Sequence, residues 1–329
     1  MAPVSLSIIG YGIMGERLLR AALDHDPAVV TVAGVWDPSP TAMARLREGL
    51  PQVRHFATPD EAVAACDCLY VASPPSSHLD HAERGFAAGK AVFCEKPLSV
   101  DVAAARSFAA GVAARKERAA VNFPFTSSFA VDQLRQWMTD GTVGTPQAVD
   151  IEIAFAGWPR PWQVDAAAWL DATPQGGFTR EVVSHFLFLT GRLLGPLALG
   201  RHAVSYPEAG KSERTITADL TAASLPIRLA GSVGTTDKPD HNLWVIEGSA
   251  GAVRLRDWAI AERRMPDGRW QEAPDAMPNE KARPLVLRRQ LDQVVSLTRG
   301  EPQKLASIGE ALAVQEIVET ILKGQHGVS

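Results

Sequence analysis

The sequence predicts two domains of different architecture: a doubly wound α/β domain, followed by an α+β domain with a mostly antiparallel sheet. Three observations lead to this fold class. Apolar strands alternate with helices up to about Ala120, a glycine-rich turn follows the first strand, and the strands beyond Val121 alternate apolar and polar residues. A chain of 329 residues has the length of about two domains. We therefore expect a first domain over residues 1–120 and a second over residues 121–329.

The first domain is expected to contain a parallel sheet. Its strands are continuous apolar runs separated by helical segments, the pattern of parallel strands that are buried on both faces. The expected strands cover Val4–Gly10, Val29–Asp37, Cys66–Pro75 and Lys90–Cys94, and the expected helices cover Glu16–Leu23, Thr41–Glu48, Pro59–Ala65 and His81–Ala88.

The strands of the second domain read as half-buried. In Gln147–Phe155 apolar residues occupy every second position, as in a strand with one face in the core. Arg214–Ala223 alternates in the same way, and short strands follow among glycine and proline turns. Helices are expected over Phe129–Thr139, Pro284–Thr298 and Ser307–Leu322. This order of elements indicates a mostly antiparallel sheet with helices laid against it.

Composition excludes several classes of protein. With 46% hydrophobic and 21% charged residues and a net charge of -4, the chain has enough apolar residues for real cores and no basic footprint for nucleic acid. No apolar run reaches membrane-spanning length, and the first residues lack the basic segment of a secretory signal. The sparse Cys66, Cys68 and Cys94 fit neither a disulfide framework nor a zinc site. We expect a soluble protein of the reducing cytoplasm, without nucleic-acid or membrane partners.

The segment GYGIMG places Gly10, Gly12 and Gly15 in G-x-G-x-x-G spacing between a strand and a helix. The first glycine allows the tight turn, the second lets the backbone approach a pyrophosphate, and the third lets helix and strand pack closely. Asp37 ends the second strand about 20 residues later, where a carboxylate binds ribose hydroxyls and repels a 2′-phosphate. The alternative, a glycine turn with an unrelated surface aspartate, is disfavoured by the strand–turn–helix context. We expect NAD, with NADP as the alternative.

The segment AVFCEKPLS ends an apolar strand with a glutamate and a lysine. Glu95 and Lys96 are costly to bury unless they have partners or a task. Pro97 restricts Lys96 to extended backbone and allows a cis Lys96–Pro97 bond. The alternative is an ordinary surface turn. Because ligands of doubly wound sheets lie outside the carboxyl ends of the strands, we expect this lysine at a ligand site.

These segments, together with ASPPSSHLDHAERGFAAGK and GGFTREVVSH, resemble the glucose–fructose oxidoreductase/inositol dehydrogenase (Gfo/Idh/MocA) family. The resemblance covers the whole chain and is most specific in G-K-x-V-x-x-E-K-P, Gly89–Pro97. It implies an N-terminal Rossmann domain and a C-terminal domain with an open sheet. It further implies NAD(P)-dependent oxidation or reduction of sugars, cyclic polyols or related small molecules. It also implies dimers or tetramers in which the open sheets stack. This stacking would cover apolar surface on the second face of each sheet.

The resemblance assigns Lys96 as the acid/base at the substrate oxygen. It assigns His185 to substrate binding and proton relay, because imidazole titrates near neutral pH. Glu181 lies four residues before His185, on the same face of an expected helix, where the family usually has Asp. An ordinary pair on a helix face is the alternative for these two residues. No third ligand accompanies them, so no metal site is expected.

Further residues are expected at the cofactor and the substrate. The expected cofactor contacts, besides those above, are Tyr11, Ile13, Met14, Ser73, Pro74, Pro75, His78, Glu95 and Asn122. The expected substrate contacts, besides Lys96, His185 and Glu181, are Arg160, Trp162 and Arg180. His78 is alternatively a buried histidine at a helix start, Glu95 a residue that positions its loop, and the tryptophans of WPRPW a means of packing their loop.

Two functions compete at this stage. The first is an NAD(P)-dependent dehydrogenase or reductase acting on CH–OH groups. The second is a protein of the same fold that senses a ligand or dinucleotide without turnover. The presence of both Lys96 and His185 favours the enzyme.

Overall fold

The computed structural model describes residues 2–324, which form two compact units. The first comprises residues up to 127 together with 284–313, and the second comprises 128–283 together with the segment that begins at 314. The chain is therefore not divided by a single cut after residue 120. One boundary lies between residues 127 and 128, and the other two fall inside the last two helices, α9 (Asn279–Arg299) and α10 (Ile308–Lys323).

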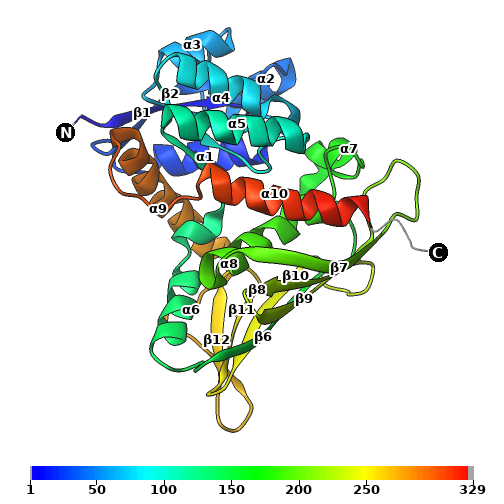
Figure 1. The fold of residues 1–329 in the computed structure, drawn as a ribbon. Coiled ribbons are helices and arrows are strands. Elements are labelled where there is room, and N and C mark those ends of the chain that lie inside the picture. Colours follow the sequence, from blue (N-terminus) through cyan, green and yellow to red (C-terminus); the bar gives the residue numbers. More distant parts are fainter. Residues whose placement is uncertain (1, 325–329) are drawn as a thin grey trace. The chain divides into compact units, whose positions relative to one another are not determined.

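The first unit contains the expected parallel sheet of a doubly wound fold (Figure 1). Five parallel strands are ordered β2-β1-β3-β4-β5. They are β1 (Val4–Ile9), β2 (Val30–Trp36), β3 (Cys68–Val71), β4 (Ala91–Cys94) and β5 (Ala119–Val121). The helices are α1 (Ile13–Leu23), α2 (Pro40–Gly49), α3 (Pro59–Ala64), α4 (His78–Ala87) and α5 (Val102–Arg115). The strand order reverses between β1 and β3, and ligands of such sheets bind at this switch point.

Late segments of the chain complete the first unit. Leu291 and Val294 of α9 are fully buried in the same apolar cluster as Leu6 of β1 and Phe93 of β4. The edge strand β5 is covered as well, because the Val121 amide donates to the carbonyl of residue 306 over 2.9 Å. The C-terminal part of the sequence thus contributes core to the N-terminal sheet.

The second unit is built on an eight-stranded sheet ordered β13-β12-β11-β10-β6-β9-β8-β7. Only β6 and β9 are parallel, so the predicted mostly antiparallel sheet is confirmed. The strands are β6 (Pro146–Phe155), β7 (Leu197–Ser205), β8 (Thr215–Ala222), β9 (Leu225–Val233), β10 (His241–Gly248), β11 (Ala252–Arg256), β12 (Ile260–Arg264) and β13 (Trp270–Glu272). The helices are α6 (Phe129–Thr139), α7 (Ala167–Leu170) and α8 (Ser184–Leu194).

One face of this sheet is apolar and carries α8. Leu255, Trp244, Ile151 and Leu229 are paired across β11, β10, β6 and β9, and all four are buried. The Trp244 indole donates to the hydroxyl of Thr190 in α8 over 2.9 Å. The alternation seen in the sequence thus marks the face on which α8 packs.

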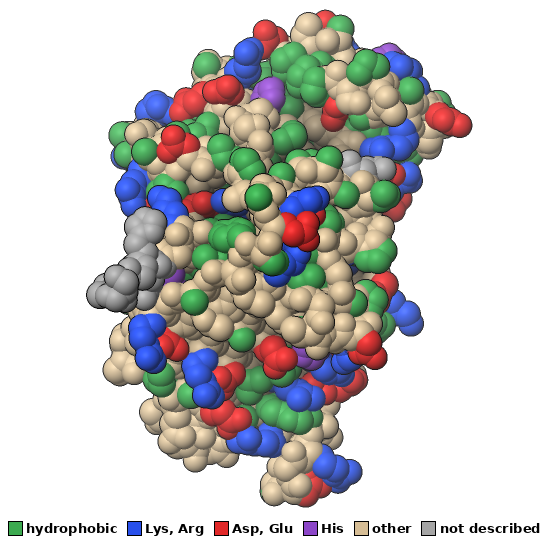
Figure 2. All heavy atoms as spheres, turned by 90° about the vertical axis from the view of Figure 1, so that its right-hand side faces the viewer, with side chains coloured by type: hydrophobic (Ala, Val, Ile, Leu, Met, Phe, Trp, Pro, Cys, Tyr) green, Lys and Arg blue, Asp and Glu red, His purple; other side chains and the backbone are tan. Residues whose placement is uncertain are grey.

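The opposite face carries charge. Moving one residue along each strand gives a row of mostly charged residues, which we call the charged row: Glu262, Arg254, Val245, Asp150, Arg228 and Asp219. Arg254 pairs with Glu262 at 2.6 Å and Arg228 with Asp150 at 2.7 Å. The expected apolar second face is therefore corrected, because ion pairs cross it between strands. Figure 2 likewise shows basic and acidic side chains intermingled over the side of the molecule that it draws.

No helix in the described part of the chain is long and apolar enough to span a membrane.

Replacing Leu291 by Ala is expected to lower the free energy of unfolding by about 2–5 kcal/mol, because it opens a cavity in a core that α9 helps to build. The same replacement at Leu285, which is 39% exposed on the same helix, is the matched control and should cost far less. Urea unfolding followed by fluorescence measures both. Equal losses would contradict a role for α9 in the core of the first unit.

Candidate cofactor and substrate sites

The glycine turn after β1 has the geometry that a dinucleotide requires. Gly10 has a φ of 99°, and a Cβ there would lie 2.5 Å from the carbonyl oxygen of Ala72. A Cβ on Gly15 would lie 1.9 Å from the carbonyl oxygen of Gly10, so this glycine lets α1 pack on the turn. A Cβ on Gly12, in contrast, would meet no atom within 4 Å. The protein's own packing thus requires the first and third glycines, whereas Gly12 leaves one side of the turn open to a ligand.

The start of α1 supplies hydrogen-bond donors beside the same turn. α1 begins at Ile13, and the residue before it, Gly12, has no side chain to cap the helix. The first N–H groups of an α-helix have no partner within the helix, and they bind phosphate groups well. Ile13 and Met14 therefore fit a pyrophosphate through their backbone, as the sequence motif suggests.

Asp37, at the end of β2, is held by two backbone amides. Its Oδ2 accepts from Tyr11 and its Oδ1 from Ser39, both over 2.7 Å. Each oxygen keeps further acceptor capacity, so the carboxylate still suits the two hydroxyls of a ribose. Tyr11 is engaged on its other side by Arg45, which donates to its carbonyl over 2.7 Å and lies 5.2 Å from the centroid of its ring. Tyr11 therefore places Asp37.

At the end of β4, Glu95 lies in a buried polar network. Its Oε1 accepts from the Tyr70 hydroxyl and, over 2.6 Å, from Nδ2 of Asn122. The Oδ1 of Asn122 accepts from Nε2 of Gln290 in α9 over 2.7 Å, which fixes the orientation of this amide. All four side chains are buried. Glu95 and Asn122, both expected at the cofactor, are thus bonded within the first unit, and the network fixes the residue that precedes Lys96.

The neighbours of Glu95 remain protonated at neutral pH. Burial raises the pKa of the Tyr70 phenol and of the Cys94 thiol well above their usual values, and the charge of Glu95 adds to both shifts. Tyr70 is therefore a hydrogen-bond donor here and not an acid/base group. Lys96 follows this network, is 9% exposed, and forms a cis peptide bond with Pro97.

His78, the first residue of α4, is enclosed by backbone. Its Nδ1 lies 2.8 Å from the carbonyl oxygen of Pro97, and its Nε2 lies 2.7 Å from that of Ser73. Burial lowers the pKa of His78 to about 4; both carbonyls oppose this shift and the charge of Lys96 adds to it. Both ring nitrogens thus face backbone carbonyls, and a contact of His78 with the cofactor stays a prediction.

The remaining expected cofactor contacts, Ser73, Pro74 and Pro75, form the turn after β3. The Ser73 hydroxyl accepts from the hydroxyl of Ser77 over 2.8 Å. Pro74 is exposed, whereas Pro75 is buried and begins a 3₁₀ turn that ends where α4 starts. This turn and the glycine turn flank the switch point between β3 and β1, so both lie where ligands of doubly wound sheets bind.

In the second unit, the Gly176–Gly177 pair leads into a π-helical turn, Thr179–Val183, before α8 begins. The sequence instead predicts a regular helix with Glu181 and His185 on one face. The π turn contains Glu181 and ends just before α8, which contains His185, so the placement of both side chains on one face stays a prediction. His185 is buried, and its ring meets Trp258 edge-on with centroids 5.3 Å apart.

A buried carboxylate explains the second glycine of the pair. The Oε1 of Glu213 accepts from the Thr179 amide over 2.7 Å. Gly177 has a φ of 103°, and a Cβ there would lie 2.2 Å from the Oε2 of Glu213. Burial raises the pKa of Glu213 above its usual value. The chain thus needs glycine at this point because a carboxylate packs against its backbone.

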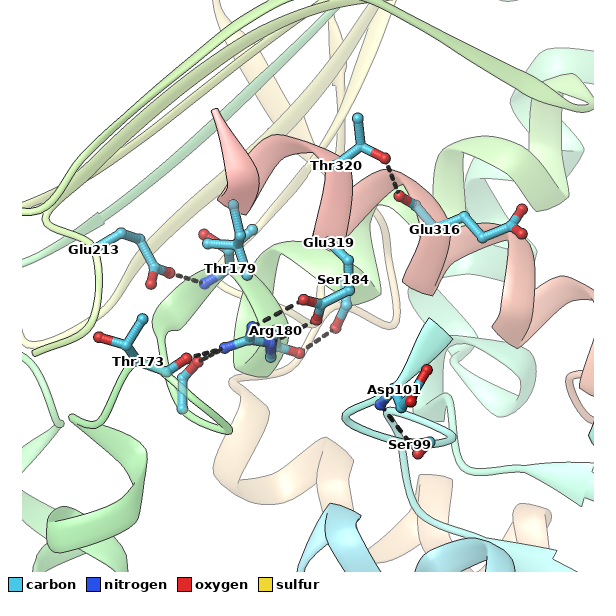
Figure 3. Close-up of polar contacts among 12 residues, drawn as sticks. Ser99, Asp101, Thr173, Thr179, Arg180, Ser184, Glu213, Glu316, Glu319 and Thr320 are labelled. Carbon is cyan, nitrogen blue, oxygen red and sulfur yellow. Dashed lines mark hydrogen bonds and ion pairs between the residues drawn. The ribbon is translucent and has the colours of Figure 1, made fainter. Parts of the chain in front are cut away.

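Arg180 is bonded within the second unit (Figure 3). Its Nε and Nη2 donate to the two oxygens of Glu319 in α10 over 2.6 and 2.9 Å. Its Nη1 donates to the carbonyls of Thr173 and Gly176 over 2.9 and 2.7 Å. The guanidinium thus has four protein acceptors, and Arg180 shapes the turn before the π-helical segment; its contact with substrate stays a prediction.

Arg160 is similarly occupied. Its Nη1 donates to Asp240 over 2.7 Å and its Nε to Oε1 of Gln163 over 3.0 Å, and the side chain is only 7% exposed. The guanidinium lies 4.6 Å from the centroid of Trp162. Arg160 and Trp162 thus contact each other within their loop, while Trp162 remains 45% exposed, so the predicted role of both at the substrate stays a prediction.

Several residues that shape these sites were not predicted from the sequence: Tyr70, Gln290, Glu213, Glu319, Asp240 and Trp258. The available signal was a polar group at an otherwise apolar position, as for Tyr70 within a buried strand and Gln290 within a helix. Lys96 belongs to the first unit and His185 to the second, so their joint action is part of the proposal below.

Comparison with known proteins agrees with this geometry. Residues 4–123 match the model of the GFO_IDH_MocA oxidoreductase family with an NAD-binding Rossmann fold. Inositol 2-dehydrogenase of Rhizobium meliloti (strain 1021) is 25% identical over 251 residues, which cover 76% of this chain and 68% of that protein. The rhizopine catabolism protein MocA of Rhizobium meliloti is 32% identical over 117 residues, 35% of each chain.

Solved structures share the fold over nearly the whole chain. An oxidoreductase from Agrobacterium radiobacter in complex with NAD+, L-tartaric acid and magnesium has a TM-score of 0.82 at 17% identity, covering 98% of this chain and 96% of that one. GenD2 from gentamicin A biosynthesis, in complex with NAD, has a TM-score of 0.79 at 20% identity, covering 98% and 94%. The glycine turn, the start of α1 and Asp37 fit the same cofactor. Residues 4–123 thus match an NAD-binding Rossmann domain of this oxidoreductase family, and the fold of the solved structures extends over nearly the whole chain.

Proposed function

We propose that this oxidoreductase is a dehydrogenase that transfers hydride between the nicotinamide of NAD and a CH–OH or keto carbon of a sugar, cyclic polyol or related compound. The observation that carries the proposal is the buried Lys96 at the carboxyl end of β4, directly after a residue that a polar network holds in place. A buried lysine at this edge of a doubly wound sheet stands where ligands bind. Inositol 2-dehydrogenase, the relative named above, has an activity of this class.

In this reaction NAD supplies the hydride acceptor or donor, and the protein handles the proton. Oxidation of an alcohol releases the hydroxyl proton, and Lys96 accepts it at the substrate oxygen. In the reverse direction Lys96 donates this proton to the carbonyl oxygen. Proton transfer by a positioned side chain contributes about two to four orders of magnitude to the rate. Glu95 keeps its place in the network and sets the backbone position of Lys96.

The second unit supplies the other substrate contacts in this proposal. His185 binds a substrate oxygen and relays protons, because imidazole titrates near neutral pH. Glu181 binds a substrate hydroxyl or orients His185. The half-buried ring of Trp258 packs edge-on against the ring of His185 from one side.

The proposed function is tested by mixing the protein with NAD and a panel of sugars and polyols that includes myo-inositol, and by following the absorbance of the reduced nicotinamide. Turnover on at least one member of the panel is expected. Binding of NAD and of a panel compound without any turnover would instead indicate a ligand-sensing protein of the same fold.

Replacing Lys96 by Ala is expected to lower kcat on the best panel substrate by roughly two to four orders of magnitude, because the proton then lacks its carrier. The dissociation constant for NAD, measured by fluorescence, should change little. Lys281→Ala, at an exposed lysine, is the matched control and should keep its activity. Normal turnover by the Lys96→Ala enzyme would refute the assignment.

Replacing Asp37 by Ala should reduce the preference for NAD over NADP by roughly tenfold or more, equivalent to about 1.4 kcal/mol, because the charge that repels a 2′-phosphate is removed. The ratio of kcat/KM for the two cofactors measures it. Asp37→Asn keeps the shape of the side chain and removes only the charge, so it should also reduce the preference for NAD. An unchanged ratio in both variants would exclude Asp37 as the determinant.

We also propose a homodimer or homotetramer formed through the eight-stranded sheet, and a cytoplasmic location. The three cysteines are buried free thiols, which suits a reducing compartment. The protein should elute on size exclusion with light scattering as a species larger than its 35.3 kDa chain. Since the charged row would lie in this interface, the assembly should respond to salt. A strict monomer at every protein concentration tested would contradict the proposal.

A further inference from the structure

We propose that His78 is a positioning residue that ties the turn after β3 to the turn after β4 and thereby fixes the backbone that carries Lys96. This inference rests on the proposed function only where it concerns turnover. The tie itself, His78 between the carbonyl oxygens of Ser73 and Pro97, is a feature of the first unit alone.

Both ring nitrogens of His78 lie within hydrogen-bond distance of a backbone carbonyl oxygen. His78 is 1% exposed, and its two ring nitrogens lie 2.7 and 2.8 Å from carbonyl oxygens that are 24 residues apart in the chain. Ser73 belongs to the turn after β3, whereas Pro97 follows Lys96 directly. One rigid ring thus spans two turns that leave neighbouring strands of the sheet, β3 and β4.

Lys96 is therefore held from two directions. On its N-terminal side Glu95 is bonded to Tyr70 and Asn122, and on its C-terminal side the Pro97 carbonyl oxygen lies 2.8 Å from Nδ1 of His78. Without the second tie, the carbonyl of the residue after Lys96 loses its contact with His78. A shift of about 1 Å in a catalytic group costs roughly a hundredfold in rate, so the backbone on both sides of the lysine matters.

The chemistry of the ring makes the two contacts unequal at neutral pH. A neutral imidazole has one N–H, so it donates to one carbonyl while the other nitrogen presents a lone pair. Only the imidazolium donates to both, and burial together with the Lys96 charge disfavours it. The Lys96 ammonium and His81 are the charged or titratable groups that act on this ring, besides the two carbonyls. Single-donor variants can therefore report which side supports Lys96.

Three substitutions separate the two sides. In His78→Asn the side-chain amide nitrogen takes the place of Nδ1 and donates toward Pro97, whereas in His78→Gln it takes the place of Nε2 and donates toward Ser73. His78→Phe keeps a ring of similar size and removes both donors. The His78→Asn and His78→Gln variants are thus the matched comparison, because each keeps one donor. The His78→Phe variant removes both contacts.

The first measurement needs no substrate. In protein labelled with ¹³C at the lysine ε-carbon, the Lys96 signal is assigned by its absence in Lys96→Arg. We expect His78→Phe to shift or split this signal, His78→Gln to do the same to a smaller extent, and His78→Asn to keep it near its original position. An unchanged Lys96 signal in folded His78→Phe would overturn the proposal. Should His78→Phe fail to fold, unchanged signals in both Asn and Gln variants would overturn it equally.

The second measurement uses NAD and the best substrate of the panel. His78→Phe should lower kcat roughly 10- to 100-fold, the cost of misplacing a catalytic group. The dissociation constant for NAD should change less than threefold, and His78→Asn should restore most of kcat. A loss confined to NAD affinity would overturn the proposal, because His78 would then serve the cofactor turn alone. Full activity of Lys96→Ala would refute the assignment of Lys96 in the proposed function. The NMR signal of Lys96 would still test whether His78 positions this lysine.

Discussion

The buried carboxylate of Glu95 is the constraint on which the first unit's site depends. A carboxylate with 7% exposure is costly to bury, and the hydroxyl of Tyr70 and the amide of Asn122 offset that cost. Gln290 orients the amide in turn. One ionisable group therefore joins three strands of the sheet and α9. Lys96 follows Glu95 directly in the chain, so the network also restricts the backbone position of Lys96.

In the second unit, the turn at Gly177 is also held by a buried carboxylate. Glu213 packs against the backbone of Gly177 and accepts from Thr179, while Arg180 is held by Glu319. In both units a buried carboxylate fixes a turn that leads to a proposed proton-handling side chain, Lys96 in one and His185 in the other. Of these contacts, Arg180–Glu319 is an ion pair, and removing one partner of a buried ion pair costs about 3–5 kcal/mol. The charged residues of these turns thus serve mainly to hold the backbone.

The sequence predicted the fold class well, because strand and helix periods and the glycine spacing are local signals. It missed β7, whose bulge interrupts the alternation of an edge strand, and it did not foresee that α9 completes the first core. It placed Lys96 and Asp37 at strand ends correctly. It did not show that Arg160 and Arg180 pair with Asp240 and Glu319, which lie 80 and 139 residues away. Long-range pairing of charges was the information that local pattern lacked.

The empty space beside Gly12 has a consequence for how variation in this turn is tolerated. A methyl group at Gly10 or Gly15 collides with backbone, so such a change weakens the folded chain whatever is bound. At Gly12 the backbone angles suit any residue and no atom lies in the way. Selection for folding alone would therefore accept alanine there, and only selection for coenzyme binding would reject it. Glycine at position 12 is therefore required by the ligand, whereas glycine at positions 10 and 15 is required by the fold.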